Sequence, residues 1–168
     1  MKYDLSDKRT THKLLDDAGF TFKKSLGQNF LTDSPVCPAM AEAAADGDTG
    51  VIEIGPGIGV LTVELAEIAK KVIAIELDER LRPILNKTLE DYDNASVIFS
   101  DVLKIDLKKL IKEEFADCSK VTVCANLPYY ITSPIIMSLL ESRLLEQLQR
   151  RIGIRRLALN LEQVLLQF

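Results

Sequence analysis

The chain has 168 residues, a hydrophobic fraction of 47% and a formal net charge of −4 at pH 7, which allows about one packed domain. The acidic balance argues weakly against a simple nucleic-acid binder, because phosphate contacts need Lys and Arg. With three cysteines and one histidine, a zinc site, a Ser-His-Asp triad and a Cys-His pair are not expected. The polar N-terminus has no signal-peptide core and no apolar run approaches membrane-spanning length, so a reducing, cytoplasmic location is the simplest interpretation.

In chain order, residues 1–20 read as a polar lead-in with a short helix near 12–18. The next helix is expected from a cap at Asp33 or Ser34, through Pro35, to about residue 45. An alternation then begins, with strands expected at 50–54, 72–76, 96–99 and 121–125 and helices at 60–70, 78–90, 106–115 and 133–146. This order predicts an α/β fold with right-handed crossovers, a mostly parallel sheet and helices on both faces.

The first strand is followed by a glycine turn, Gly-Pro-Gly-Ile-Gly at 55–59, that opens a helix. Glycines there let a ligand approach the backbone closely. Glu76 ends the next strand, where a carboxylate can accept both hydroxyls of a ribose, and Asp101 ends the third, where it can accept from an adenine amine. The G-x-G-x-G spacing favours S-adenosylmethionine over NAD, since no pyrophosphate has to be cradled. The alternative is that both carboxylates only cap helices or face water.

The fourth strand leads into Asn-Leu-Pro-Tyr at 126–129, at the edge where open α/β sheets bind ligands. The Asn126 side-chain carbonyl and the Leu127 backbone carbonyl, held by Pro128, can accept the two hydrogens of adenine N6. Tyr129 can stack on the base. Methyl transfer would then rest on orientation and electrostatics, without a general base, and on an adenine extruded from its helix or already unpaired. The alternative is a turn followed by a core tyrosine.

Together these motifs resemble the ribosomal RNA adenine dimethyltransferase family, specifically its small-subunit dimethyladenosine transferases linked to kasugamycin sensitivity. The resemblance covers residues 21 to about 140 and rests on KSLGQNFL (24–31), EIGPGIGVLT (53–62), ELD (76–78), DV (101–102) and NLPYYITSP (126–134). It implies a Rossmann-like, class I S-adenosylmethionine-dependent methyltransferase. The implied substrate is a pair of adjacent adenines near the 3′ end of small-subunit (16S) rRNA in a pre-ribosomal particle, which would receive four methyl groups on N6.

The resemblance also implies a set of cofactor-binding residues: Gln28, Asn29 and Leu31 at the methionine end, Gly55 and Gly57 beneath the cofactor, Glu76 at the ribose, Asp101 at the adenine, with Leu77, Val102 and Asn126 completing the set. Asn126 would touch both the cofactor and the target amine. The expected catalytic group is Asn126, Leu127, Pro128 and Tyr129. Neither a metal ion nor a membrane is an expected partner.

Beyond about Arg143 the chain does not clearly match the family, whose members usually carry a second, helical domain. We therefore expect an arm with a cofactor-lining segment at 1–34, a methyltransferase core at 35–148 and a divergent tail at 149–168, with the helical domain absent and the last strands of the sheet incomplete. Leucines alternate at 157, 159 and 161, so a fifth strand there and an extension of the preceding helix over 144–151 both stay open. On this basis we expect cofactor binding with low or absent activity on ribosomal particles.

Three alternative functions stay open. One is the large-subunit methyltransferase that confers macrolide resistance. The second is a non-catalytic ribosome-assembly or transcription factor on the same fold. The third is a DNA or protein amide methyltransferase, which would carry Asn-Pro-Pro-Tyr where this chain has leucine at position 127.

Overall fold

The computed structural model describes Leu5 and residues 7–20, 36–125 and 157–159. Seven predicted site residues lie outside these ranges: Gln28, Asn29, Leu31, Asn126, Leu127, Pro128 and Tyr129. The helix expected at 133–146 and the domain boundaries near 34 and 148 also lie outside them. All of these stay predictions.

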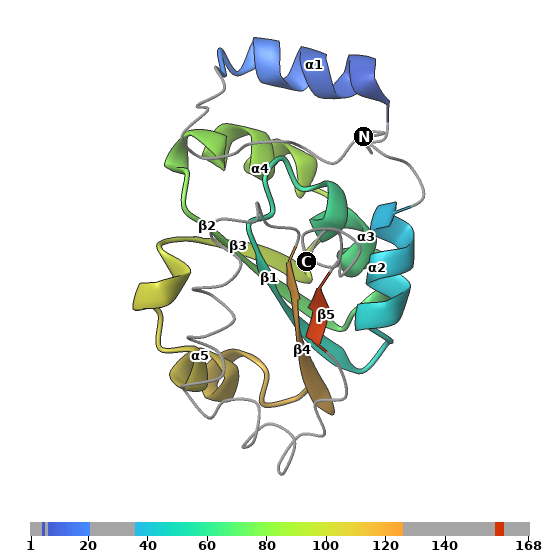
Figure 1. The fold of residues 1–168 in the computed structure, drawn as a ribbon, viewed down its shortest axis with the longest axis vertical. Helices are drawn as coiled ribbons and strands as arrows, with labels where there is room; N and C mark the ends of the chain where they lie inside the picture. Colours follow the sequence, from blue (N-terminus) through green and yellow to red (C-terminus); the bar gives the residue numbers. More distant parts are fainter. Residues whose placement is uncertain (1–4, 6, 21–35, 126–156, 160–168) are drawn as a thin grey trace, which may run out of the picture.

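A parallel sheet of five strands lies at the centre of the described chain (Figure 1). Its spatial order is β3 (Ala95–Phe99), β2 (Lys71–Glu76), β1 (Thr49–Ile54), β4 (Lys120–Ala125) and β5 (Leu157–Leu159). Every neighbouring pair is parallel. The predicted α/β class is therefore confirmed, and the strand at 157–159, one of two readings of that segment, pairs with β4.

Chain order and spatial order diverge at β1. The chain leaves β1 for β2 and β3 on one side and then returns to place β4 on the other side of β1. This reversal creates a switch point between β1 and β4, and ligands of open α/β sheets bind at such points, outside the carboxyl ends of the strands.

Helices cover both faces of the sheet, as predicted. On one face, α2 (Val36–Ala44) and α3 (Val60–Ile68) pack against Val51 and Val72. On the other, α5 (Leu107–Glu114) packs against Ile52 and Ile73. Neighbouring residues of each central strand thus serve opposite cores, which explains why the strands read as continuous apolar runs rather than as alternating ones.

The helix expected at 78–90 is divided into a 3-10 turn, η2 (Glu79–Leu81), and α4 (Arg82–Thr88), which carries proline in its first turn. A second 3-10 turn, η3 (Val102–Lys104), follows β3. Proline lacks the N–H of a helix interior, so its place in the first turn of α4 matches the division.

The N-terminal helix α1 (Lys8–Asp17) begins four residues before the expected start at 12. Asp7 caps it, since its carboxylate accepts from the N–H groups of Arg9 and Thr10 at 3.3 and 3.1 Å. Leu15 of this helix is buried with Ile84 and other residues around α4. The N-terminal helix is therefore part of the packed fold.

Gly50 in β1 provides a test of this packing. A Cβ atom there would lie 2.2 Å from Cδ1 of Phe115, whose side chain is fully buried. We expect Gly50→Ala to lower the free energy of unfolding by about 1–3 kcal/mol, because overpacking a filled core is costly. Urea denaturation measures this change.

The matched control is Gly47→Ala, because a Cβ at Gly47 meets nothing within 4 Å. It should change the stability by less than about 0.5 kcal/mol. Equal effects of the two substitutions would contradict the packing of Phe115 against β1.

Candidate functional site

Three predicted features meet at the carboxyl edge of the sheet. In spatial order they are Asp101 after β3, Glu76 at the end of β2, and the glycine turn at 55–59 after β1. The register aligns these ends, since Ile54 pairs with Ile75 and Glu76 with Phe99. The structure thus brings together residues that lie far apart in the chain, next to the switch point between β1 and β4.

The glycine turn requires glycine for its backbone. Gly55, Gly57 and Gly59 have φ values of 73°, 61° and 94°, in the region that side chains with a Cβ rarely adopt. Gly55 donates its N–H to Ile75 O at 3.0 Å, and Gly59 caps the start of α3. The chain therefore reverses tightly over the end of β1 and presents backbone N–H groups at the edge.

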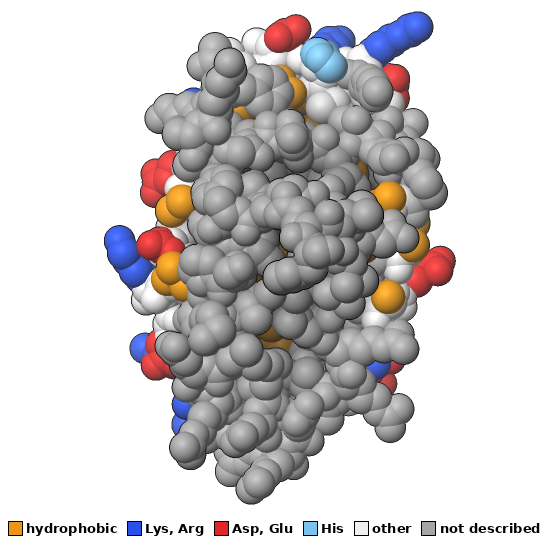
Figure 2. Space-filling model, viewed as in Figure 1, with side chains coloured by type: hydrophobic (Ala, Val, Ile, Leu, Met, Phe, Trp, Pro, Cys, Tyr) orange, Lys and Arg blue, Asp and Glu red, His pale blue; other side chains and the backbone are white. Residues whose placement is uncertain are grey.

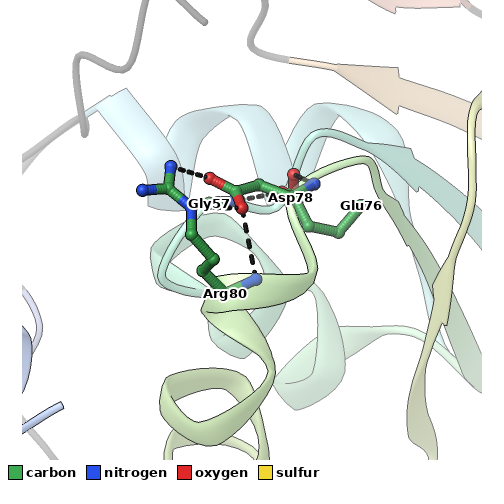
Figure 3. A network of polar contacts seen from close by, with 4 residues as sticks. All are labelled: Gly57, Glu76, Asp78 and Arg80. Atoms are coloured by element: carbon green, nitrogen blue, oxygen red, sulfur yellow. Dashed lines mark hydrogen bonds and ion pairs between the residues drawn. The ribbon is translucent and has the colours of Figure 1, made fainter. Parts of the chain in front are cut away.

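Glu76 joins this turn to the loop that follows β2 (Figure 3). Its Oε2 accepts from the N–H of Gly57 at 3.1 Å and its Oε1 accepts from the N–H of Asp78 at 2.8 Å. Burial raises the pKa of this carboxyl, and the two amide donors act in the opposite direction. An ionised carboxylate has about four acceptor positions, so these two bonds leave capacity for a ligand hydroxyl on each oxygen.

Asp78 and Arg80 complete the polar network at this loop. Asp78 is 8% exposed and caps η2 by accepting from the N–H of Arg80 at 3.2 Å. The Arg80 guanidinium donates to both carboxylate oxygens of Asp78, at 2.8 and 2.5 Å. The sequence predicted Asp78 as a cap, but not this ion pair.

Asp101 also acts as a cap. Its Oδ1 accepts from the N–H of Leu103 at 3.0 Å at the start of η3, and its Oδ2 lies 4.0 Å from Nζ of Lys104. This is the capping role that the sequence left open as the alternative for Asp101. The expected bond to an adenine amine stays a prediction.

Apolar side chains lie beside both carboxylates in the chain. Leu77 is 52% exposed and Leu103 is 48% exposed, which is unusual for leucine in the described part of the chain. Val102 is half-buried and packs against the core beneath α5. Leu77 and Val102 were predicted from the family resemblance, whereas Leu103 was not. Exposed leucines at a ligand edge suit a flat aromatic ring, because binding would remove their apolar surface from water.

Glu53 is a further acidic residue that the sequence reasoning left without a role. It lies in β1 with 1% of its surface exposed, and its Oε2 has no hydrogen-bond partner among the described residues, nor has the buried Thr62 Oγ1. Burial, helped by the nearby Glu76, raises its pKa to about 8. The signal that singles it out is a carboxylate inside an apolar strand, since buried charges are rare unless paired.

Metal-ligating groups, apolar helices and thiols are further features to consider in the part of the chain that the structure describes. No group of three or more His, Cys, Asp or Glu side chains there is arranged to hold a metal ion. No helix among those residues is long and apolar enough to cross a membrane. Burial raises the pKa of the Cys37 and Cys124 thiols to about 12, so neither is a reactive thiolate near neutral pH. Around the face shown in Figure 2, acidic and basic side chains intermingle at the rim.

The burial of Glu53 predicts a pH dependence of stability. Its pKa rises from 4.5 to about 8 on folding, so the folded chain holds the proton more tightly than the unfolded chain. The tighter proton binding contributes to the free energy of unfolding. This contribution is complete below about pH 4.5 and is lost as the pH rises toward 8, and it is on the order of a few kcal/mol. We expect Glu53→Gln to flatten the profile of unfolding free energy between pH 5 and 8 and to raise stability at pH 8.

Denaturation in urea at several pH values measures this effect. Glu42→Gln removes an exposed carboxylate of α2 and serves as the control. A Glu53→Gln protein that is destabilised equally at pH 5 and pH 8 would show that the carboxyl is not protonated in the folded chain.

Comparisons with known proteins agree with the geometry. The family of ribosomal RNA adenine dimethylases matches residues 19–166. Ribosomal RNA small subunit methyltransferase A of Bacillus pumilus is 56% identical over 145 residues, which are 86% of this chain and 50% of that protein. The chain thus spans about half the length of this curated relative.

Solved structures show the same fold. The 23S rRNA methyltransferase ErmE superposes with a TM-score of 0.56 and 34% identity, over 67% of this chain and 43% of that one. An RNA methyltransferase from Salinibacter ruber, solved with S-adenosyl-L-homocysteine, superposes with a TM-score of 0.52 and 20% identity, over 67% of this chain and 70% of that one. The second likeness shows the fold alone. With the family match extending over most of its length, the chain belongs to the ribosomal RNA adenine dimethylase family.

Proposed function

We propose that this chain carries the cofactor-binding part of an enzyme that transfers methyl groups from S-adenosylmethionine to N6 of two adjacent adenines in small-subunit rRNA. The observation that carries the proposal is the Glu76 carboxylate, held by the N–H of Gly57 at the switch-point edge of a parallel sheet. The 56% identity to a small-subunit methyltransferase directs the proposal to that RNA.

The described residues suit a nucleoside cofactor. Positive φ angles in the glycine turn permit close approach to the backbone, the Glu76 oxygens have spare acceptor capacity for ribose hydroxyls, and Leu77 offers an exposed apolar surface. Bound S-adenosylmethionine supplies a methyl group on a positively charged sulfur. Where the Glu76 carboxylate is ionised, its negative charge favours a cationic ligand over an anionic one.

The remaining site residues form the proposed reactive half. Asn126 would accept a hydrogen bond from the target amine through its side chain, and Leu127 would accept one through a backbone carbonyl that Pro128 holds in place. Tyr129 would stack on the adenine. In the same proposal, Gln28, Asn29 and Leu31 hold the methionine end of the cofactor, while Asp101 and Val102 contact its adenine.

The substrate and location belong to the same proposal. The substrate would be unpaired rRNA in a pre-ribosomal particle, because N6 is inaccessible inside a helix. Cys37, Cys118 and Cys124 are free thiols, which agrees with a reducing compartment such as the cytoplasm. The likeness to a 23S rRNA methyltransferase keeps large-subunit RNA as the second candidate substrate.

Loss of the Glu76 charge should weaken cofactor binding. We expect Glu76→Gln to reduce the affinity for S-adenosylhomocysteine by about 10- to 100-fold, since hydrogen bonds to a charged group contribute about 1.5–3 kcal/mol. Isothermal titration calorimetry measures the affinity. Glu114→Gln, at the opposite edge of the sheet where Glu114 pairs with Lys71, should bind like the wild type; an equal loss there would argue against a specific role of Glu76.

The substrate is tested by mass spectrometry of rRNA after incubation with excess protein and S-adenosylmethionine. We expect at most a low yield of N6,N6-dimethyladenosine in unmethylated small-subunit rRNA, and none with Asn126→Ala, because that variant lacks the proposed acceptor. Methylation of large-subunit rRNA instead would favour the macrolide-resistance type. Cofactor binding without methylation of either RNA would favour the non-catalytic alternative.

A further inference from the structure

A continuous series of contacts joins the loop after β2, which holds Asp78 and Arg80, to the N-terminal helix α1. The N–H of Asp78 donates to Glu76, and the carboxylate of Asp78 accepts two bonds from Arg80 (Figure 3). The Arg80 guanidinium carbon lies 4.9 Å from the centre of the Phe20 ring, within the range of a cation–π contact. Glu76 is thus linked through two residues to the end of α1.

The position of Phe20 is set by the way in which α1 ends. Gly19 has φ of 60°, its N–H donates to Asp16 O, and the N–H of Phe20 donates to Leu15 O at 2.9 Å. This is the Schellman arrangement, in which a left-handed glycine turns the following residue back onto the helix. Phe20 therefore packs with Leu15 rather than continuing outward.

The same helix shares a buried cluster with the glycine turn. Leu15 belongs to a buried cluster with Ile58, the fourth residue of that turn, and with Ile84 and Leu85 of α4. Two sets of interactions therefore connect α1 to the glycine turn and to the loop after β2. One is apolar, through Ile58 to the turn over β1, and one is polar, through Arg80 to the loop after β2.

We propose that Asp78 and Arg80 are positioning residues that couple the docking of α1 to the binding of cofactor by Glu76. This inference rests on the proposed function, in which Glu76 holds the ribose. The bidentate pair fixes Asp78, whose N–H in turn fixes one oxygen of Glu76. The same guanidinium contacts the Phe20 ring. One conformation of the loop therefore both orients the Glu76 carboxylate and holds the end of α1 in place.

Coupling of this kind is reciprocal. If cofactor binding stabilises the docked helix by a given factor, then undocking the helix must weaken cofactor binding by the same factor. The contacts at position 80 require arginine rather than lysine. A planar guanidinium can pair with a carboxylate in bidentate fashion and stack on a ring, whereas an ammonium group forms neither contact in the same way.

Calorimetry with S-adenosylhomocysteine and amide hydrogen exchange across α1 test the coupling in the 168-residue chain. We expect ligand to protect α1 in the wild type. Arg80→Ala should weaken binding by about fivefold or more and abolish this protection, and Arg80→Lys should not restore either. Phe20→Leu keeps apolar volume but loses the ring and should behave like Arg80→Ala, whereas Phe20→Tyr keeps the ring and should behave like the wild type.

Lys71→Ala is the matched control. Lys71 lies at the other end of β2, where it pairs with Glu114 at 2.7 Å and lies 5.9 Å from the centre of the Phe115 ring. Its loss should leave ligand affinity and α1 protection unchanged. Equal losses in Lys71→Ala and Arg80→Ala, or wild-type affinity and protection in both Arg80→Ala and Phe20→Leu, would overturn the coupling alone. A wild-type chain that binds no ligand would overturn the proposed function as well.

Discussion

Two backbone amides on one buried carboxylate organise the described edge of this sheet. Glu76 ends β2, yet its oxygens accept from Gly57, in the turn after β1, and from Asp78, in its own loop. A buried carboxylate without such donors would carry a large desolvation cost. The conformations of the turn and of the loop are thereby tied together, and the left-handed glycines are what allow the amide of Gly57 to face the carboxylate.

The two buried acids of this region differ in how they are satisfied. Glu76 has two amide donors, whereas Glu53 has an oxygen without a partner among the described residues and a pKa raised to about 8. Both lie on the central strands, and the charge of Glu76 disfavours ionisation of Glu53. In the proposed function, the spare acceptor positions of Glu76 would receive the hydroxyl groups of the cofactor ribose.

Family membership and the choice of RNA substrate depend on different observations. The family match covers residues 19–166, and an RNA methyltransferase of 20% identity shares the fold. The choice between small- and large-subunit RNA depends on sequence identity, because ErmE has the same fold at 34% identity. The coupling inferred for α1 would make the N-terminal helix part of the cofactor site rather than an appendage.

The local sequence pattern was sufficient to predict the strands, the glycine turn and the positions of Glu76 and Asp101 at strand ends. Apolar runs, glycine turns and helix caps depend on residues that are neighbours in the chain. The early start of α1 was missed, since its cap at Asp7 is a single polar residue in a polar stretch. The position of β4 beside β1, the burial of Glu53 and the Arg80–Phe20 contact were decided only by tertiary structure. Each of these depends on residues far apart in the chain, whose proximity is set by which strands pair and which helix faces pack together.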